Sequence, residues 1–282
     1  MNMKLKSTLV ASVLAFAVAG PANAAIVDMS TGSSDLVLNI WDTTSSTSYT
    51  EDLGINMSSF MAGVTGTTAA TLAASALPTG DHTFAPDALL TSFLSTATLG
   101  TTFWSVTAGD NVGTSGFQQK NYLTTSTGTT MPISNTVLLS GGGNASNYFS
   151  LMNTVTGANP DALGSGTTYA GASGAAGGGW GNKWVNTSTL YGNSLNFLYM
   201  TPSSTSTVAA AGVAAFKGAG GVNSYWTLNT SPTGALGTLT FTAPVPEPGE
   251  WALMLSGFGL IGFVALRRKN NSMSFTNTTS FA

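Results

Sequence analysis

The sequence predicts a mainly β protein: an antiparallel β-sandwich with one or two short helices, flanked by an N-terminal signal helix and a C-terminal transmembrane helix. Short stretches that alternate between apolar and polar residues recur along the chain, with Gly and Pro clustered between them. No regular alternation of strand and helix suggests a parallel sheet. Aromatic residues make up 10% of the chain and charged residues only 7%, which favours a folded domain over a disordered one.

Six stretches carry the strand pattern. In Asp35–Asp42, the residues Leu36, Leu38 and Ile40 recur at every second position, as in a strand with one buried face. The other five are Thr101–Thr107, Asn121–Ser126, Ser194–Met200, Ser224–Asn229 and Leu236–Ala243. Turn-forming residues at 107–111 predict that the second stretch ends there, and Pro232 and Gly234 predict a hairpin between the last two.

Two stretches have helical spacing instead. After Pro86 and Asp87, apolar residues recur at three- and four-residue intervals up to Ala97, which predicts a short amphipathic helix. A second helix is predicted within residues 144–157, with Asn144 or Ser146 as its N-cap.

The N-terminus has the layout of a cleaved secretory signal. Lys4 and Lys6 precede an apolar stretch from Leu9 to Ala19, which is too short to be a good membrane anchor. A small-residue site follows, so we expect signal peptidase to cleave between Ala24 and Ala25. This divides the chain into a signal peptide over residues 1–24 and a β-rich extracellular domain over residues 25–243.

The C-terminal region, residues 244–270, combines three features. Val245, Pro246, Glu247 and Pro248 form an extended, accessible motif, because proline disfavours helix. The apolar stretch Trp251–Leu266 is at the short end of what a membrane-spanning helix needs. Arg267, Arg268 and Lys269 then form a membrane stop that stays on the cytoplasmic side, so the preceding body lies outside. Residues 271–282 form a polar tail.

These residues resemble the PEP-CTERM sorting signal of Gram-negative bacteria. The resemblance rests on Val245–Pro248, the Trp251–Leu255 start of the apolar stretch, its Gly-rich middle and the basic cluster, and it covers about the last tenth of the chain. It implies processing by exosortase, a membrane-embedded cysteine transpeptidase, and association with exopolysaccharide and biofilm or floc matrix. The polar tail departs from the usual pattern, and an ordinary anchor that no sortase cleaves is the alternative.

Composition excludes several other classes. Between Ala25 and Ala243 the cations are Lys120, Lys183 and Lys217, so no clustered basic residues are available to neutralise a nucleic-acid backbone. The chain has no Cys, which excludes zinc and iron–sulfur sites built on thiolates. We expect no cofactor and assign no metal site. A calcium site from Asp42, Glu51, Asp52 or Asp110 is chemically reasonable, but no calcium-binding motif is present.

The Gly-rich segment around residues 164–184 is the most biased part of the body. It lacks the Gly-Lys-Ser/Thr ending of a phosphate-binding loop, so a surface loop is the better interpretation. Trp180 and Trp184, with Tyr191 nearby, form a possible aromatic platform for a sugar ring. Cover for the hydrophobic core is the favoured explanation of these aromatic residues.

Catalytic groups are scarce, and no catalytic residue is assigned. His82 is the one imidazole in the chain; Asp81 precedes it, but neighbouring side chains on an extended strand point apart. We interpret His82 as a solvated loop residue. Glycoside hydrolysis needs two facing carboxyl groups. The candidates for such a pair are Glu51, Asp52, Asp81, Asp87 and Asp110.

Two functions remain open. The first is a non-enzymatic surface or matrix protein, exported through an inner-membrane-anchored precursor, which interacts with exopolysaccharide or with copies of itself. The second is an exported, glycoside hydrolase-like enzyme that acts on matrix polysaccharide. The scarcity of acid–base groups favours the first. Whether two or more carboxyl groups meet in one pocket is the observation that separates them.

Overall fold

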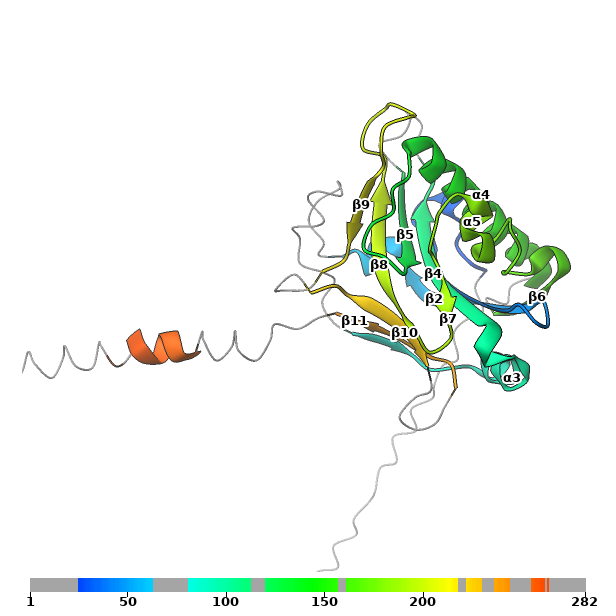
Figure 1. The fold of residues 1–282 in the computed structure, drawn as a ribbon, viewed down its shortest axis with the longest axis horizontal. Helices are drawn as coiled ribbons and strands as arrows, with labels where there is room; N and C mark the ends of the chain where they lie inside the picture. The colour runs from blue at the N-terminus through cyan, green and yellow to red at the C-terminus, as the bar shows by residue number, and fades with distance from the viewer. Residues whose placement is uncertain are drawn as a thin grey trace, which may run out of the picture.

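The computed structural model describes residues 25–62, 81–112, 120–156, 161–217, 222–229, 236–243, 255–261 and 263. Within these residues eleven antiparallel strands form one curled sheet (Figure 1). The strands are β1 (Asp35–Asp42), β2 (Thr47–Asn56), β3 (His82–Phe84), β4 (Thr102–Asp110), β5 (Asn121–Ser126), β6 (Ala162–Ser165), β7 (Thr189–Leu190), β8 (Ser194–Thr201), β9 (Gly212–Ala215), β10 (Tyr225–Asn229) and β11 (Thr238–Thr242). The helices of the body are α1 (Met57–Phe60), α3 (Ala88–Thr96), α4 (Asn135–Thr156) and α5 (Gly179–Asn182).

The mainly β, antiparallel prediction is confirmed, but the two-sheet sandwich is wrong. The strand order is β3-β11-β10-β8-β5-β4-β1-β2-β6, with β7 paired to β4 and β9 to β8. The β4–β5 and β5–β8 ladders link β1 and β2 to β8, β10 and β11 in one continuous sheet. Alternation along a strand reveals which face is buried, but it does not reveal which strands share a sheet.

Both faces of the central strands are covered. Leu36, Leu38 and Ile40 of β1 face one core, which the curl of the sheet encloses together with α1 and α3. Val37 and Trp41 face the other core, which α4 and the loop around α5 cover (Figure 1). All eight residues of β1 are therefore buried.

Several strand boundaries match the prediction. β1 and β5 have the predicted ends, and β10 pairs with β11 as an antiparallel hairpin, of whose connection residues 230–235 lie outside the described ones. β4 runs on to Asp110, although turn residues predicted that it would end near Thr107. Gly109 lies within β4, at a position where a Cβ would be under 3 Å from the Tyr122 ring and the Met29 sulfur. Close packing therefore explains this glycine.

Helix α3 confirms the first helix prediction. It begins at Ala88, and the Asp87 side chain caps it by accepting a hydrogen bond from the Leu90 backbone N–H at 2.5 Å. Leu90, Phe93 and Leu94 are the buried face of this helix.

Helix α4 corrects the second helix prediction. It has 22 residues and begins at Asn135, so Asn144 and Ser146 lie in its interior and do not cap it. Gly141–Gly143 separate the first turns of α4 from the predicted part. Glycine is a poor helix former, so the sequence carries no helical signal across this run. Gly141 lies against the Trp184 ring and Gly142 against the Tyr122 ring, at positions where a Cβ would overlap the aromatic atoms. Tertiary packing thus requires residues that helix propensity disfavours.

The predicted C-terminal span is described in part. Residues 255–261 and 263 are helical, and Leu255, Phe258 and Ile261 are about two-thirds exposed, at 64–67%. The ends of the predicted span, residues 251–254 and 264–266, lie outside the described residues. No helix in the described part of the chain is long and apolar enough to cross a membrane.

Candidate functional site

The residues of the sorting motif and the membrane stop lie outside the described part of the chain, so their roles stay predictions. The body ahead of them is fixed up to its last described residue. The Ala243 backbone N–H, which follows β11, donates a hydrogen bond to Asp81 Oδ1 at 2.9 Å. Val245 therefore follows this anchored end of the sheet after a single intervening residue, Pro244.

The predicted signal cleavage site adjoins a firmly docked segment. Ala24 lies outside the described residues, and Ala25 is exposed, whereas Ile26 is buried at 3% exposure. Asp28 accepts hydrogen bonds from the hydroxyls of Ser146 and Ser150 on α4. Burial acts to raise the pKa of Asp28, but these hydrogen bonds outweigh it and hold the pKa below its usual value. A mature chain that starts at Ala25 would keep every one of these contacts.

Three carboxyl groups, which we name the carboxyl cluster, meet where β2, β6 and α3 adjoin: Glu51, Asp87 and Asp161. The register pairs Thr50 with Ala162, which places Glu51 opposite Asp161 across the antiparallel ladder. Asp87 caps α3, which packs against both strands. None of the three lysines of the body belongs to β2, β6 or α3. These elements therefore carry no positive charge that could neutralise the cluster.

Mutual repulsion and burial keep protons on this cluster. Burial, with the charges of Asp161 and Asp87, raises the pKa of Glu51 to about 8. Burial and the neighbouring Asp87 raise the pKa of Asp161 to about 6. The buried Tyr49 hydroxyl has no hydrogen-bond partner of normal geometry among the described residues, and burial followed by the Glu51 charge raises its pKa. Glu51 therefore carries a proton at neutral pH beside Asp161, which ionises at a lower pH.

Sequence reasoning named Glu51 and Asp87 but missed Asp161. No motif marks Asp161, and only the β2–β6 pairing, which links residues over a hundred positions apart, brings it to Glu51. The candidates Asp81 and Asp110 take part in other contacts: Asp81 holds Ala243, and Asp110 accepts a hydrogen bond from the Val112 backbone.

The four residues considered for calcium are not brought together. Asp42 closes the β1–β2 turn, where hydrogen bonds from Thr44, Thr101 and their neighbours outweigh burial and lower its pKa to about 2. Asp52 follows Glu51 and so projects from the opposite face of β2. Burial, with the nearby Asp35, raises the pKa of Asp52 to about 7. Among the described residues, no three acidic or histidine side chains are placed to hold a metal ion.

His82 lies in strand β3 and is half-buried, which corrects its interpretation as a solvated loop residue. Its ring packs near Phe60 and Phe241, with centroids 5.7 and 6.3 Å apart. β3 is an edge strand of the sheet and pairs with β11.

The aromatic platform proposed for a sugar is not formed. Trp180 and Trp184 are buried, at 0% and 1% exposure, in the core beneath α4. Tyr191 packs against the core on the other face of the sheet, and its hydroxyl accepts a hydrogen bond from the Gly237 backbone. The favoured interpretation of the two tryptophans, cover for the core, agrees with these positions.

The two tryptophans hold an unusual backbone turn. Residues Gly179–Asn182, labelled α5, all have φ between 51° and 74°, so this turn is left-handed. Left-handed geometry costs about 1–2 kcal/mol for a residue with a Cβ, which applies to Trp180 and Asn182. The Trp180 indole N–H donates to Thr107 Oγ1, and its backbone oxygen accepts from the Asn144 amide, at 3.1 and 3.0 Å. Burial and hydrogen bonding of Trp180 therefore offset the strain.

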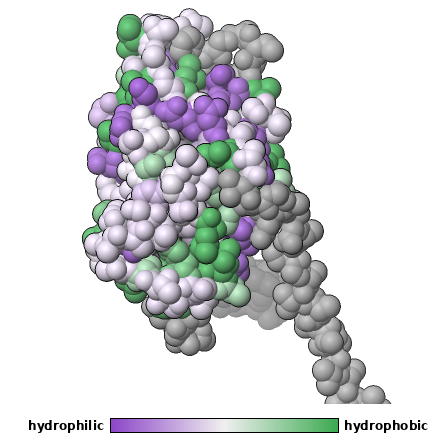
Figure 2. Space-filling view, turned by 90° about the vertical axis from the view of Figure 1, so that its right-hand side faces the viewer, coloured by the Kyte–Doolittle hydropathy of each residue, from purple (hydrophilic) through white to green (hydrophobic). Residues whose placement is uncertain are grey.

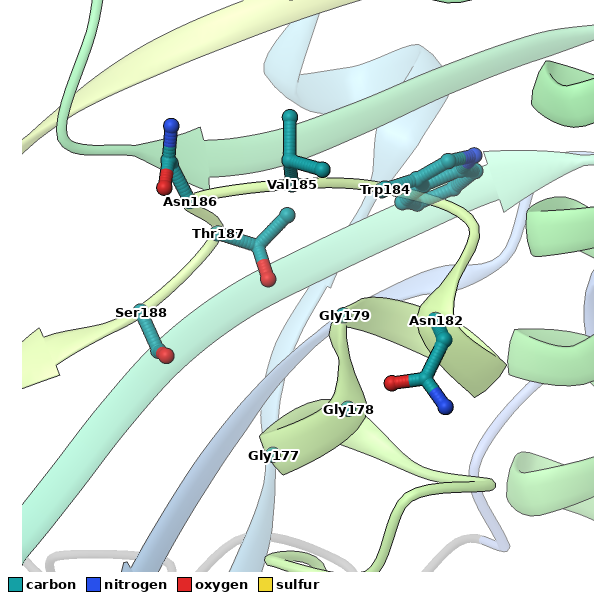
Figure 3. A pocket seen from close by; sticks show the side chains of 9 residues that line it. All are labelled: Gly177, Gly178, Gly179, Asn182, Trp184, Val185, Asn186, Thr187 and Ser188. Carbon is teal, nitrogen blue, oxygen red and sulfur yellow. The ribbon is translucent and has the colours of Figure 1, made fainter.

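A cleft of about 310 Å³ lies beside this turn (Figure 3). The Gly177–Gly179 backbone and the segment from Trp184 to Ser188 line it together with Asn182. Its polar side chains are the amides of Asn182 and Asn186 and the hydroxyls of Thr187 and Ser188, and no charged side chain lines it. The cleft therefore presents neutral donors and acceptors of hydrogen bonds.

The class of the protein follows from its tail. After the folded body the sequence carries a Pro-Glu-Pro motif, an apolar stretch and a basic cluster, an order that implies an exported protein anchored in the membrane and then processed. Residues 244–269 match the family model of the PEP-CTERM protein-sorting motif, which confirms the resemblance and is consistent with an exosortase substrate. No curated protein and no solved structure matches the chain.

Proposed function

We propose that this protein is an exosortase-processed protein of the cell surface or extracellular matrix, and that its body is a non-enzymatic element associated with exopolysaccharide in a biofilm or floc. The PEP-CTERM motif at residues 244–269 is the observation that carries the proposal. Exosortase and signal peptidase are then the processing partners, and membrane insertion is a transient step.

The surface chemistry supports an association with neutral polymer. The whole chain has only 7% charged residues, and those of the body are mostly carboxylates. Figure 2 shows one face of the molecule on which pale residues of near-neutral hydropathy predominate, with smaller hydrophilic and apolar groups among them. Hydroxyl and amide side chains on such a surface can hydrogen-bond to sugars or to a second copy without the salt sensitivity of charge pairing.

The carboxyl cluster favours a second candidate function, an exported glycoside hydrolase-like enzyme. A protonated Glu51 beside an ionised Asp161 is the kind of asymmetry that acid–base catalysis uses. The first proposal is better supported, because three clefts formed by described residues are lined by no Asp or Glu. The nearest of them, between α3 and β6, is lined instead by Phe93, Leu163 and several hydroxyls.

Substitution of two residues in the sorting motif tests the proposed function. We expect a Pro246→Ala, Glu247→Gln variant to accumulate as an unprocessed precursor, because the transpeptidase loses its recognition sequence. Cell fractionation and blotting with an antibody to the body should show most of it in the membrane fraction. The matched control is Pro244→Ala with Glu250→Gln, which makes the same changes on either side of Val245–Pro248 and should be processed normally.

Neutralising the basic cluster should have the opposite effect to changing the motif. A short, Gly-containing apolar span is held poorly without flanking charges. Changing Arg267, Arg268 and Lys269 to Gln should therefore weaken membrane retention before processing and give premature or misrouted release. If the motif variant and this variant both fractionate like the wild type, the tail does not act as a sorting signal.

A further inference from the structure

The cleft beside the left-handed turn has walls that are fixed before any ligand arrives. The Trp184 indole N–H donates to the Leu138 carbonyl of α4 at 3.1 Å, and the Trp184 backbone N–H donates to the Gly179 carbonyl at 2.8 Å. The Trp180 ring packs edge-on against Phe149, with centroids 5.9 Å apart. Both tryptophans thus tie the turn to α4, and a preorganised wall lowers the entropy lost on binding.

The backbone of the turn is shaped for close approach. Gly179 has φ 59°, and a Cβ there would overlap the Trp184 carbonyl oxygen, so only glycine fits. Gly177 and Gly178 complete this floor without side chains. The backbone N–H groups of Gly177, Gly178 and Gly179 donate to alanine carbonyls within the protein, so this floor gives a ligand room to approach but no backbone donor.

The side chains around the floor are amides and hydroxyls. Figure 3 shows the polar ends of Asn182 and Thr187 extending toward the Gly177–Gly179 turn, from two different segments. Asn182 and Asn186 are exposed and both have left-handed backbone, with φ 59° and 60°. Asn tolerates this geometry better than most residues and also brings an amide that can donate and accept.

The lining selects a ligand class. No lining carboxylate suits a cation, and no lining Lys or Arg suits a phosphate or uronate. The volume of about 310 Å³ is at the lower end of the range for small-molecule sites. Several neutral groups that both donate and accept hydrogen bonds match a ligand with several neutral hydroxyls.

We propose that this cleft binds a sugar unit of a neutral polysaccharide, held by the Asn182 and Asn186 amides and the Thr187 hydroxyl above the glycine floor. The inference deepens the proposed function, on which it rests for the presence of polysaccharide around the exported protein. Binding here is by hydrogen bonds to side-chain amides and a hydroxyl, in contrast to the aromatic platform that the buried tryptophans rule out.

The test is a binding assay on the purified full chain with dextran and galactomannan as neutral probes and alginate as an anionic one. We expect binding to at least one neutral polymer and none to alginate, measured by affinity electrophoresis and calorimetry. An Asn182→Gly, Asn186→Gly variant removes both amides while keeping the left-handed backbone accessible, and should bind about tenfold more weakly.

Ser46→Gly is the matched control, because Ser46 is exposed, has φ 53° and lies in the β1–β2 turn, away from the residues that line the cleft. It should bind like the wild type. Thermal unfolding of each variant verifies that it is folded, and Asn182→Gly alone serves if the double variant is not. The inference is overturned if the wild type binds neither of the neutral polymers or prefers alginate. It is also overturned if the cleft variants bind with unchanged affinity.

Processing of the same variants is followed by blotting in the producing cells. A correctly processed chain that fails to bind neutral polymer contradicts this inference alone. A chain that keeps its C-terminal tail contradicts the proposed function, whatever the purified protein binds.

Discussion

Gly142→Ala is expected to lower the free energy of unfolding by about 3 kcal/mol, as overpacking of a filled core does. A Cβ at this position would overlap the ring and hydroxyl of Tyr122. Tyr122 is fully buried and cannot turn away without breaking its hydrogen bond to Asn111, which is 2.6 Å long. Gly141→Ala should be similarly destabilising, because the Trp184 indole occupies the equivalent space.

The neighbouring Gly143 provides the matched control. It is in the same helix, α4, but a Cβ there would have no atom within 4 Å. Gly143→Ala should therefore stabilise the protein by about 0.5–1 kcal/mol, through helix propensity alone. Urea unfolding of the three variants measures these differences. Equal effects of all three substitutions would contradict the close packing of α4 on the sheet.

Glu51→Gln is expected to stabilise the protein at pH 8 by about 1–2 kcal/mol, after allowance for partial exposure, and to change little at pH 4. The pKa of Glu51 is raised to about 8, that of Asp52 to about 7 and that of Asp161 to about 6. In the unfolded chain such groups ionise near pH 4. The native state therefore binds more protons between about pH 4 and 8, and the stability that these protons give is lost as the pH rises through this window.

The directions of the pKa shifts also predict how the stability of the protein varies over the whole pH range. Stability should be highest near pH 4–5, because below this range the unfolded chain takes up protons that Asp28 and Asp42, with their lowered pKa values, resist in the native state. Thermal unfolding from pH 3 to 9 measures the profile. Asp81→Asn, which removes a carboxylate outside the cluster, is the control and should leave the fall between pH 5 and 8 in place. A wild-type profile that is flat across this range would contradict the account of the cluster.

The same Glu51→Gln variant separates the two candidate functions. A matrix protein should keep its surface or biofilm phenotype, because the substitution leaves the fold intact and stabilises it at neutral pH. A hydrolase that uses Glu51 as its acid would release reducing ends from polysaccharide as the wild type and lose that activity as the variant.

Local patterns in the sequence predicted the local structure well. The alternation in Asp35–Asp42 and Asn121–Ser126 identified β1 and β5 with correct ends, and Asp87 identified the start of α3. These signals succeed because capping and the two-residue alternation of side chains along a strand act within a few residues.

Features that depend on distant residues were missed. The pairing of β5 with β8 turns the expected sandwich into one curled sheet, and nothing local encodes it. The Gly141–Gly143 run in α4 is explained only by the aromatic rings packed against it. The left-handed turn at Gly179–Asn182 is likewise stabilised by contacts with α4 and Thr107, far away in sequence.

The mass of the released protein tests the central claim most directly. Mass spectrometry of the extracellular or surface form should give an N-terminus near Ala25, where the docked segment at Ile26 begins, and a C-terminus close to Glu247 of the sorting motif. An extracellular protein that retains Arg267, Arg268 and Lys269 at its C-terminus would contradict the account of this chain as an exosortase substrate.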